Sequence, residues 1–92
     1  MLERYQKTVR MSMFGHTHSD IFKSVLSQDN YPIGVMTVCG SLTTWGGINP
    51  SFCVYTLDKE MFLPVNRETY SFDIAAANES GVPSWSLFTN WQ

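Results

Sequence analysis

The sequence predicts a β-rich part of a larger α/β fold, incomplete as a stand-alone fold. Its 92 residues allow at most one small domain. In chain order the patterns indicate one helix, then four or five strands and a short tail, so helices to cover both faces of a sheet are missing. Three Trp, six Phe and four Tyr are many for so small a core. We therefore expect some apolar surface to be covered by other chain.

The first part of the chain predicts a helix end and a strand. Residues 2–9 carry apolar side chains at helical spacing without a capping residue before them, as in a helix that begins further upstream. Residues 11–14 form a short apolar run that ends at Gly15, which predicts a strand followed by a tight loop over residues 16–20. Residues 21–26 fit a strand or a helix equally.

The middle of the chain predicts two strands separated by a long loop. A turn cluster at residues 28–32 precedes residues 34–39, which are rich in β-branched side chains and indicate a buried strand. Residues 40–50 hold three glycines, a proline and several hydroxyls, a composition typical of a surface loop. Residues 52–57 alternate as a strand does and end at the charged residues 58–60.

The last part of the chain predicts one further strand, a helical turn and an apolar tail. Tyr70, Phe72 and Ile74 alternate on one face, so a strand is expected over residues 68–74. The alanines of residues 75–78 suggest a helical turn, which Gly81-Val82-Pro83 ends. The tail that follows contains Trp85 and Trp91.

Charge and hydropathy argue against a nucleic-acid partner and against a transmembrane segment. The net charge of −2, the pI near 5.5 and the scattered basic residues argue against binding to a nucleic-acid polymer, which needs clustered Lys and Arg. No apolar run approaches the length of about eighteen residues that a transmembrane segment needs. The chain begins Met1-Leu2-Glu3-Arg4, without the apolar stretch of a secretory signal.

Cys39 and Cys53 allow two interpretations. One bridge between them would close a short loop and stabilise the fold by about 3 kcal/mol. Both cysteines lie in strand-like apolar runs, where buried free thiols are the preferred interpretation. The chain also carries one glycosylation acceptor pattern, Asn78-Glu79-Ser80, while Asn49-Pro50-Ser51 is excluded by its proline.

His16 and His18 are the candidate metal ligands. They are the two histidines of the chain, and in extended backbone a separation of two places both side chains on one side. Gly15 permits a positive φ or a close backbone approach just before them. Imidazole suits zinc, iron or manganese, but two histidines do not complete a site. Asp20 is the nearest carboxylate and serves either as a ligand or to orient a histidine.

Several motifs carry a resemblance to a known family. Gly15-His16-Thr17-His18 resembles the Gly-His-x-His motif of calcineurin-like metallophosphoesterases. The following blocks come in a compatible order: Ser41-Leu42-Thr43-Thr44, Asn49-Pro50, Val54-Tyr55, Glu68-Thr69-Tyr70, Ala77-Asn78 and Pro83-Ser84-Trp85. Together they resemble the C-terminal region of acid sphingomyelinase-like phosphodiesterases, over essentially the whole chain.

The resemblance implies a fold and a chemistry. The chain would be the C-terminal part of a metallophosphoesterase β-sandwich flanked by helices, with residues 1–30 ending the catalytic domain and residues 31–92 forming an acid sphingomyelinase-type subdomain. Two zinc ions would activate water for attack on a phosphodiester, either sphingomyelin or a nucleotide. His16 would bind the ion that upstream Asn and His ligands complete, and His18 the ion shared with an upstream Asp-x-His. A secreted or lysosomal glycoprotein is implied as well.

The departures from the family pattern limit what the chain alone is expected to do. The upstream Asp-x-His, Gly-Asp-x-x-Asp and Gly-Asn-His-Glu blocks are absent, so the chain by itself is expected to be inactive and to require the missing N-terminal catalytic part. An arginine is expected where Cys53 stands, which puts the conformation of the Asn49-Pro50 loop in doubt. Two alternatives stay open: a non-catalytic β-rich interaction module with vestigial histidines, and a fragment of another metallophosphoesterase that acts on nucleotides.

The remaining polar and aromatic residues have structural interpretations. Tyr55, Tyr70 and Trp85 are expected in a core or an interface between subdomains rather than in a choline or lipid pocket. Glu68 and Asp73 fit solvated charges at strand ends. The loop over residues 40–50 is interpreted as a connection more than as a cleft wall, and Ser41 and Ser51 have no partner for nucleophilic catalysis outside the metal motif.

Overall fold

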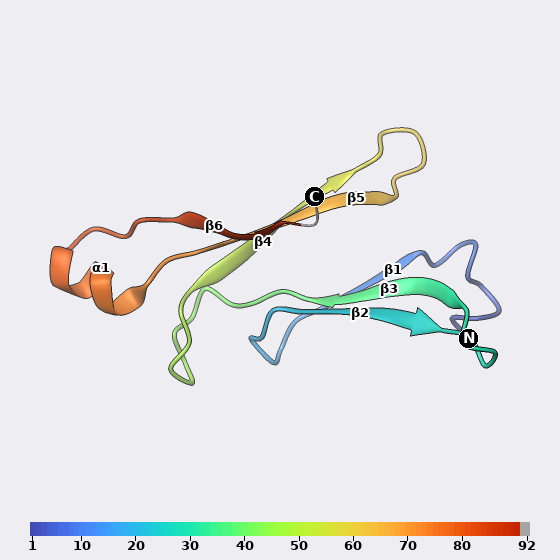
Figure 1. The fold of residues 1–92 in the computed structure, drawn as a ribbon, viewed down its shortest axis with the longest axis horizontal. Helices are drawn as coiled ribbons and strands as arrows, with labels where there is room; N and C mark the ends of the chain where they lie inside the picture. Colours follow the sequence, from blue (N-terminus) through green and yellow to red (C-terminus); the bar gives the residue numbers. More distant parts are fainter. Residues whose placement is uncertain (91–92) are drawn as a thin grey trace. The chain divides into compact units, whose positions relative to one another are not determined.

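The structure is a computed structural model that describes residues 1–90. The chain divides into two compact units, Met1–Cys39 and Gly40–Gln92, and each is described by itself. Each unit contains a three-stranded sheet, and one short helix belongs to the second (Figure 1). The β-rich character that the sequence predicts is confirmed. The assignment of residues 1–30 and 31–92 to two family domains stays a prediction.

The first unit is a mixed sheet with strand order β1-β3-β2. β1 spans Met11–Phe14, β2 spans Ile21–Leu26 and β3 spans Pro32–Val38. β3 lies in the middle and pairs in parallel with β1 and antiparallel with β2. Val38 pairs with Phe14 on one side and with Ile21 on the other, so the end of β1, the end of β3 and the start of β2 share one edge.

Two sequence expectations in this unit are settled by backbone pairing. Residues 21–26 form a strand because β3 offers each of them a partner, with one register shift between Val25 and Leu26. The helix expected over residues 2–9 is wrong, since this segment consists of turns. Its hydrogen bonds mix two spacings: Tyr5 N–H donates to Met1 O at 3.1 Å, whereas Thr8 N–H donates to Tyr5 O at 2.8 Å. A helix of so few residues is marginal without packing support.

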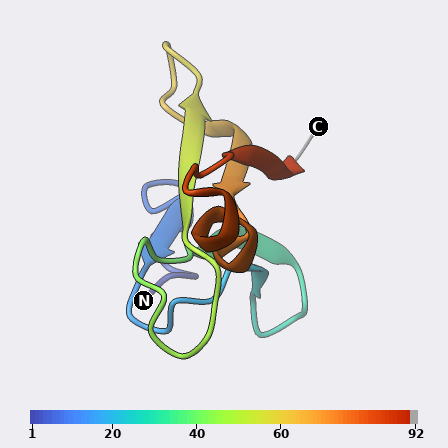
Figure 2. The same ribbon diagram turned by 90° about the vertical axis from the view of Figure 1, so that its left-hand side faces the viewer.

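The second unit is an antiparallel sheet with strand order β4-β5-β6. β4 spans Ser51–Leu57, β5 spans Pro64–Ser71 and β6 spans Ser86–Asn90, and the helix α1, Ile74–Ser80, connects β5 to β6. Figure 2 looks at α1 roughly along its axis. The loop over residues 40–50 precedes β4, as predicted. The apolar tail contains β6, and Trp91 lies outside the described residues.

The strand expected over residues 68–74 ends three residues early because a capping residue intervenes. β5 stops at Ser71, and Ile74 begins α1. Asp73 is the N-cap of the helix, and its Oδ1 accepts from Ala75 N at 3.0 Å and from Ala76 N at 3.3 Å. This carboxylate satisfies two donors that the helix start leaves open. The interpretation of Asp73 as a solvated strand-end charge is therefore wrong.

Little apolar surface is buried in either unit. Among residues 1–90, Val38 is the one hydrophobic side chain in the buried core, at 8% exposed. Large hydrophobic side chains are exposed in both units, and they include Phe14, Phe22, Leu42, Trp45, Phe62 and Phe88. Exposed apolar surface of this extent usually marks a contact with other protein or a ligand. Within the described residues no helix is long and apolar enough to cross a membrane.

Candidate metal site

The two histidines lie in the loop between β1 and β2. This loop leaves the sheet at the edge where β1 and β3 both end, and there Cys39 N–H donates to Phe14 O at 3.3 Å (Figure 1). Loops at the carboxyl ends of parallel strands are the usual place for ligand-binding residues in α/β sheets. The fold thus places His16 and His18 where a site would be expected.

The backbone of the loop differs from the extended conformation that the sequence suggests. His16 has φ 79° and His18 has φ 64°, both in the left-handed region, whereas Gly15 is not among the residues with positive φ. Thr17 N–H donates to Gly15 O at 3.0 Å, which closes a tight turn with His16 at its centre. The left-handed region costs a residue with a side chain about 1–2 kcal/mol. Such strain gathers at functional sites, where the surrounding structure holds it in place.

The side chains of the loop are of the types that bind zinc, but they are too few to complete a zinc site. His16 is exposed and His18 is half-buried, and both present imidazole nitrogens from one short segment. Asp20 is exposed in the same loop, and both it and His18 take part in interactions. Within residues 1–90, no group of three or more His, Cys, Asp or Glu side chains is placed to hold a metal ion.

The Asn49-Pro50 loop in the second unit is held by three hydrogen bonds. Ile74 N–H donates to Asn49 Oδ1 at 3.1 Å, and Ser71 Oγ donates to Pro50 O at 2.9 Å. Ser51 N–H donates to Ser41 O at 2.9 Å. The donors are the Ile74 amide, the Ser71 hydroxyl and the Ser51 amide, so none of these bonds needs an arginine at position 53.

Both cysteines are disulfide-bonded, so the preferred interpretation as free thiols is wrong. Cys39 and Cys53 are the two cysteines of the chain, and the bond therefore closes the segment between them. Apolar runs around each cysteine indicate a buried thiol equally well. The pairing depends on long-range geometry that local composition does not carry.

A guanidinium lies beside Cys53 after all. Arg67 on β5 is 4% exposed, and its Nη2 donates to Cys53 Sγ at 3.2 Å. The same guanidinium lies 5.7 Å from the centre of the Tyr55 ring, in a cation–π contact. The sequence pattern did not predict this role for Arg67; its one signal is an arginine within an otherwise uncharged stretch of residues 61–67.

Glu68 and Tyr70 form a polar pair on the other face of β5. The Tyr70 hydroxyl donates to Glu68 Oε2, and Asn66 Nδ2 donates to Glu68 Oε1 at 3.5 Å. The hydrogen bond to Glu68 raises the pKa of Tyr70, and desolvation and the negative charge of Glu68 act in the same direction. Glu68 is therefore a hydrogen-bonding partner and not merely a solvated strand-end charge.

Replacing Glu68 by glutamine is expected to return the pKa of Tyr70 toward its ordinary value of about 10. The raised pKa of Tyr70 stabilises the folded chain at pH values below about 10. This contribution is lost as the pH rises through the pKa of Tyr70 in the folded chain. Tyrosinate absorbance, taken as the difference between the chain and its Tyr70→Phe variant, measures the midpoint. An unchanged midpoint in Glu68→Gln would contradict the assigned cause.

Aromatic rings in the second unit pack against one another. Phe52 stacks on Tyr70 at a centroid distance of 5.3 Å, and Trp85 meets Phe52 edge-on at 5.0 Å. Trp85 also meets Phe72 at 4.5 Å. Pairs at these distances add about 0.5–1.5 kcal/mol beyond their area burial. These ring contacts give Tyr70 and Trp85 a structural role in the second unit.

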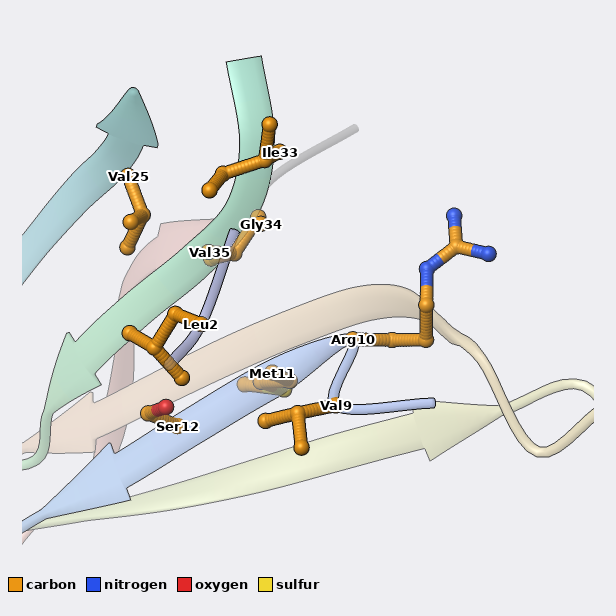
Figure 3. Close-up of a pocket in the computed structure, with 9 residues that line it drawn as sticks. All are labelled: Leu2, Val9, Arg10, Met11, Ser12, Val25, Ile33, Gly34 and Val35. Atoms are coloured by element: carbon orange, nitrogen blue, oxygen red, sulfur yellow. The ribbon is translucent and has the colours of Figure 1, made fainter. Parts of the chain in front are cut away.

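The first unit also contains a small apolar pocket. Figure 3 shows Leu2 from the N-terminal turns lying over the sheet, while the Arg10 side chain points away from the other residues. The lining residues are Leu2, Val9, Arg10, Met11, Ser12, Val25, Ile33, Gly34 and Val35. A ligand site usually has several polar groups that converge on one point. This pocket lacks them and is an unfilled space under the turns.

Comparison with known proteins relates the chain to one group of enzymes. It is 34% identical over 98% of its length to sphingomyelin phosphodiesterase B of Dictyostelium discoideum, and 34% identical over 95% to sphingomyelin phosphodiesterase of Bos taurus. It is 29% identical over 92% to the human acid sphingomyelinase-like phosphodiesterase 3b. The chain spans about 15% of the length of the first two and 22% of the third. No protein-family model matches it. Over almost its whole length, the chain therefore belongs to the acid sphingomyelinase-like phosphodiesterases, as a segment of such a protein.

Proposed function

We propose that the chain is the C-terminal segment of a metal-dependent phosphodiesterase and supplies two ligands of its metal site. The observation that carries this is the pair of histidines, both in the left-handed backbone region, at the edge where two parallel strands end. In this proposal residues 1–30 end the catalytic domain, residues 31–92 form the C-terminal subdomain, and the two sheets contribute to a β-sandwich of the complete protein.

Zinc is the metal that we propose for this site. His16 and His18 would each hold one of two ions, with the remaining ligands supplied from outside this chain. Zinc bound in such a site polarises the phosphoryl oxygens and provides hydroxide at neutral pH. The contribution of this chain is to fix two imidazoles through a turn whose backbone is already set.

Sphingomyelin is the proposed substrate, because the relatives are sphingomyelin phosphodiesterases by name. The test is hydrolysis of sphingomyelin by the longer protein that carries this segment, with a bis-nucleotide phosphodiester as the comparison substrate. We expect hydrolysis that a chelator abolishes and added zinc restores. Activity that chelation leaves intact would overturn the metal assignment, and preference for the nucleotide would favour the other metallophosphoesterase branch.

The exposed apolar surface supports a requirement for the rest of the enzyme. Val38 is the one buried hydrophobic residue among those described, and two histidines do not complete a zinc site. The isolated chain is therefore expected to have no zinc-dependent phosphodiesterase activity, and measurable turnover would overturn this. The alternative is a non-catalytic module, which the reading frame upstream distinguishes: Asp-x-His and Gly-Asn-His-Glu blocks support the enzyme, and unrelated sequence supports the module.

We further propose that the protein is secreted or lysosomal and carries a glycan on Asn78. Asn78 is exposed on α1, and the oxidised cysteines fit a compartment where disulfides persist. Expression in a eukaryotic secretory host should give a chain whose mass falls on treatment with a glycan-releasing amidase. Asn78→Gln should abolish that shift, and Asn49, excluded by Pro50, is the internal control. A secreted, disulfide-bonded chain without the shift would contradict the glycan.

A further inference from the structure

The turn between β4 and β5, residues 58–63, carries two large apolar side chains. Met61 is 68% exposed and Phe62 is 71% exposed, and the sequence from position 61 to position 66 contains no charged residue. In Figures 1 and 2 this turn, drawn in yellow, extends beyond the ends of both strands. Exposed apolar side chains that lie together usually mark a contact with something outside the chain.

Hydrogen bonds fix the shape of the β4–β5 turn. Asp58 N–H donates to Leu63 O at 2.8 Å, and Phe62 N–H donates to Asp58 O at 2.7 Å. The Asp58 carboxylate also accepts from Met61 N–H at 2.8 Å. Phe62 has φ 56°, a left-handed conformation that few residues with a side chain adopt. Because the turn is already ordered, little conformational entropy is lost when a partner surrounds its two apolar side chains.

The size of the exposed group favours a lipid surface over a second protein. A specific protein–protein interface buries about 800 Å² on each partner. Two side chains at a turn offer less than this, since even an aromatic residue buries only about 150–250 Å². A bilayer needs no matching surface, and apolar groups at its surface are buried about 5–10 Å deep. Met61 and Phe62 are of the size that such a site accepts.

The charges beside the apolar residues favour a bilayer without net charge. Asp58, Lys59 and Glu60 directly precede Met61 and carry two negative charges and one positive charge. Anionic membranes attract clusters of Lys and Arg, whereas residues 58–63 contain one Lys and no Arg. Burial of apolar surface, and not attraction between charges, is therefore the force available for binding.

We propose that the β4–β5 turn binds membranes by inserting Met61 and Phe62 into the surface of a zwitterionic lipid bilayer. The choice of a lipid partner rests on the proposed function, because sphingomyelin is a bilayer lipid and its hydrolysis takes place at a membrane surface. The turn belongs to the second unit and the histidine loop to the first, so residues 58–63 contact lipid and take no part in the reaction.

The first test measures whether position 62 enters the bilayer. In the complete protein, Phe62→Cys is labelled with the fluorophore nitrobenzoxadiazole, and peptide mass spectrometry verifies the labelled position. The protein is mixed with vesicles of phosphatidylcholine and sphingomyelin that carry a nitroxide quencher on the lipid acyl chains. We expect blue-shifted emission that the nitroxide quenches, and the same quenching when the salt concentration rises from about 0.1 M to about 1 M.

The matched control is Phe88→Cys on β6, which replaces a phenylalanine of the same unit that is 69% exposed. Its probe should not be quenched, because general adhesion of apolar surface to the vesicles would quench both positions. Absence of quenching at position 62, or equal quenching at positions 62 and 88, would overturn the proposal. Quenching that high salt abolishes would overturn the assignment to apolar burial.

The second test separates lipid binding from the reaction. Phe62→Ser in the complete protein should weaken binding to the same vesicles by at least about tenfold in a flotation assay, while Phe62→Leu should retain most of it. Both variants should hydrolyse a water-soluble phosphodiester at the rate of the unaltered protein. Equal vesicle affinity of Phe62→Ser and the unaltered protein would overturn the proposal. Absence of phosphodiester hydrolysis in the unaltered protein would instead overturn the proposed function, and the quenching at position 62 would still decide whether the turn inserts.

Discussion

If the chain belongs to the phosphodiesterase proposed above, replacing His16 by glycine in the complete protein is expected to lower kcat/KM for phosphodiester hydrolysis by more than about 100-fold. Changes to residues that only support a metal ligand already cost about 10–100-fold, and loss of the ligand itself costs more. Glycine adopts φ 79° without strain, so the loss reports the missing imidazole and not a disturbed backbone. Steady-state kinetics and the zinc content of the purified protein measure the effect.

The neighbouring positions provide the controls for this prediction. His18→Gly should lose activity to a similar extent, because His18 has the same backbone conformation and would hold the second ion. Thr17→Ala, an exposed residue of the same loop, should retain most of the activity and the full zinc content. Near-normal turnover in either histidine variant would show that the pair does not ligate the metal.

Removing the disulfide is expected to destabilise the chain by about 3 kcal/mol, since a bridge that closes a loop of about 15 residues restricts the unfolded chain by that amount. The test compares urea unfolding of the disulfide-bonded chain with that of the double variant Cys39→Ser, Cys53→Ser. Tryptophan fluorescence follows the transition, because Trp85 contacts Phe52 and Phe72 in the second unit.

Chemical reduction is the matched control for the disulfide prediction. Treating the unaltered chain with a phosphine reductant should lower the unfolding midpoint to that of the double serine variant, whereas the variant itself should not respond. Equal midpoints for the oxidised and reduced chains would mean that the bond contributes nothing to stability. A response of the double variant to the reductant would expose an artefact of the reagent.

The strands that local pattern predicts well are those whose own sequence is apolar or alternating. Residues 11–14 and 52–57 are apolar or alternating. β3 pairs with the first segment without interruption, and β5 pairs with the second apart from a register shift between Thr56 and Leu57. Residues 21–26 satisfy no period clearly, and only the pairing with β3 decides that they form a strand. For that segment the structure is decided by pairing with residues 32–38, which the periodicity of residues 21–26 does not contain.

Two errors have local physical causes. Phe72 and Ile74 continue the alternation of β5. Asp73 between them accepts hydrogen bonds from the first amides of α1, and this cap begins a helix where the alternation predicts a strand. Residues 2–9 have helical spacing but too few residues and too little packing to hold a regular helix. Both outcomes depend on energies of about 1 kcal/mol, which periodicity does not weigh.

The candidate site was predictable in identity and not in geometry. The Gly-His-x-His pattern singles out His16 and His18, and the structure places them together in one loop at a strand edge. Their left-handed backbone was not predicted, because few residues with a side chain adopt it and Gly15 was the expected residue for a positive φ. The disulfide and the contact of Arg67 with Cys53 depend on pairing across the chain and were equally hidden.

Arg67 also bears on how substitutions in this segment are compared. The family pattern leads one to expect an arginine at position 53, and a column-by-column comparison scores Cys53 as the loss of a positive charge. In the sheet, the Arg67 guanidinium contacts the Cys53 sulfur from the neighbouring strand β5, where Arg67 lies two residues before Thr69, the partner of Cys53. A positive charge therefore lies beside position 53, although the residue at that position is a cysteine. An arginine at position 53 would therefore bring a second guanidinium beside the buried one of Arg67.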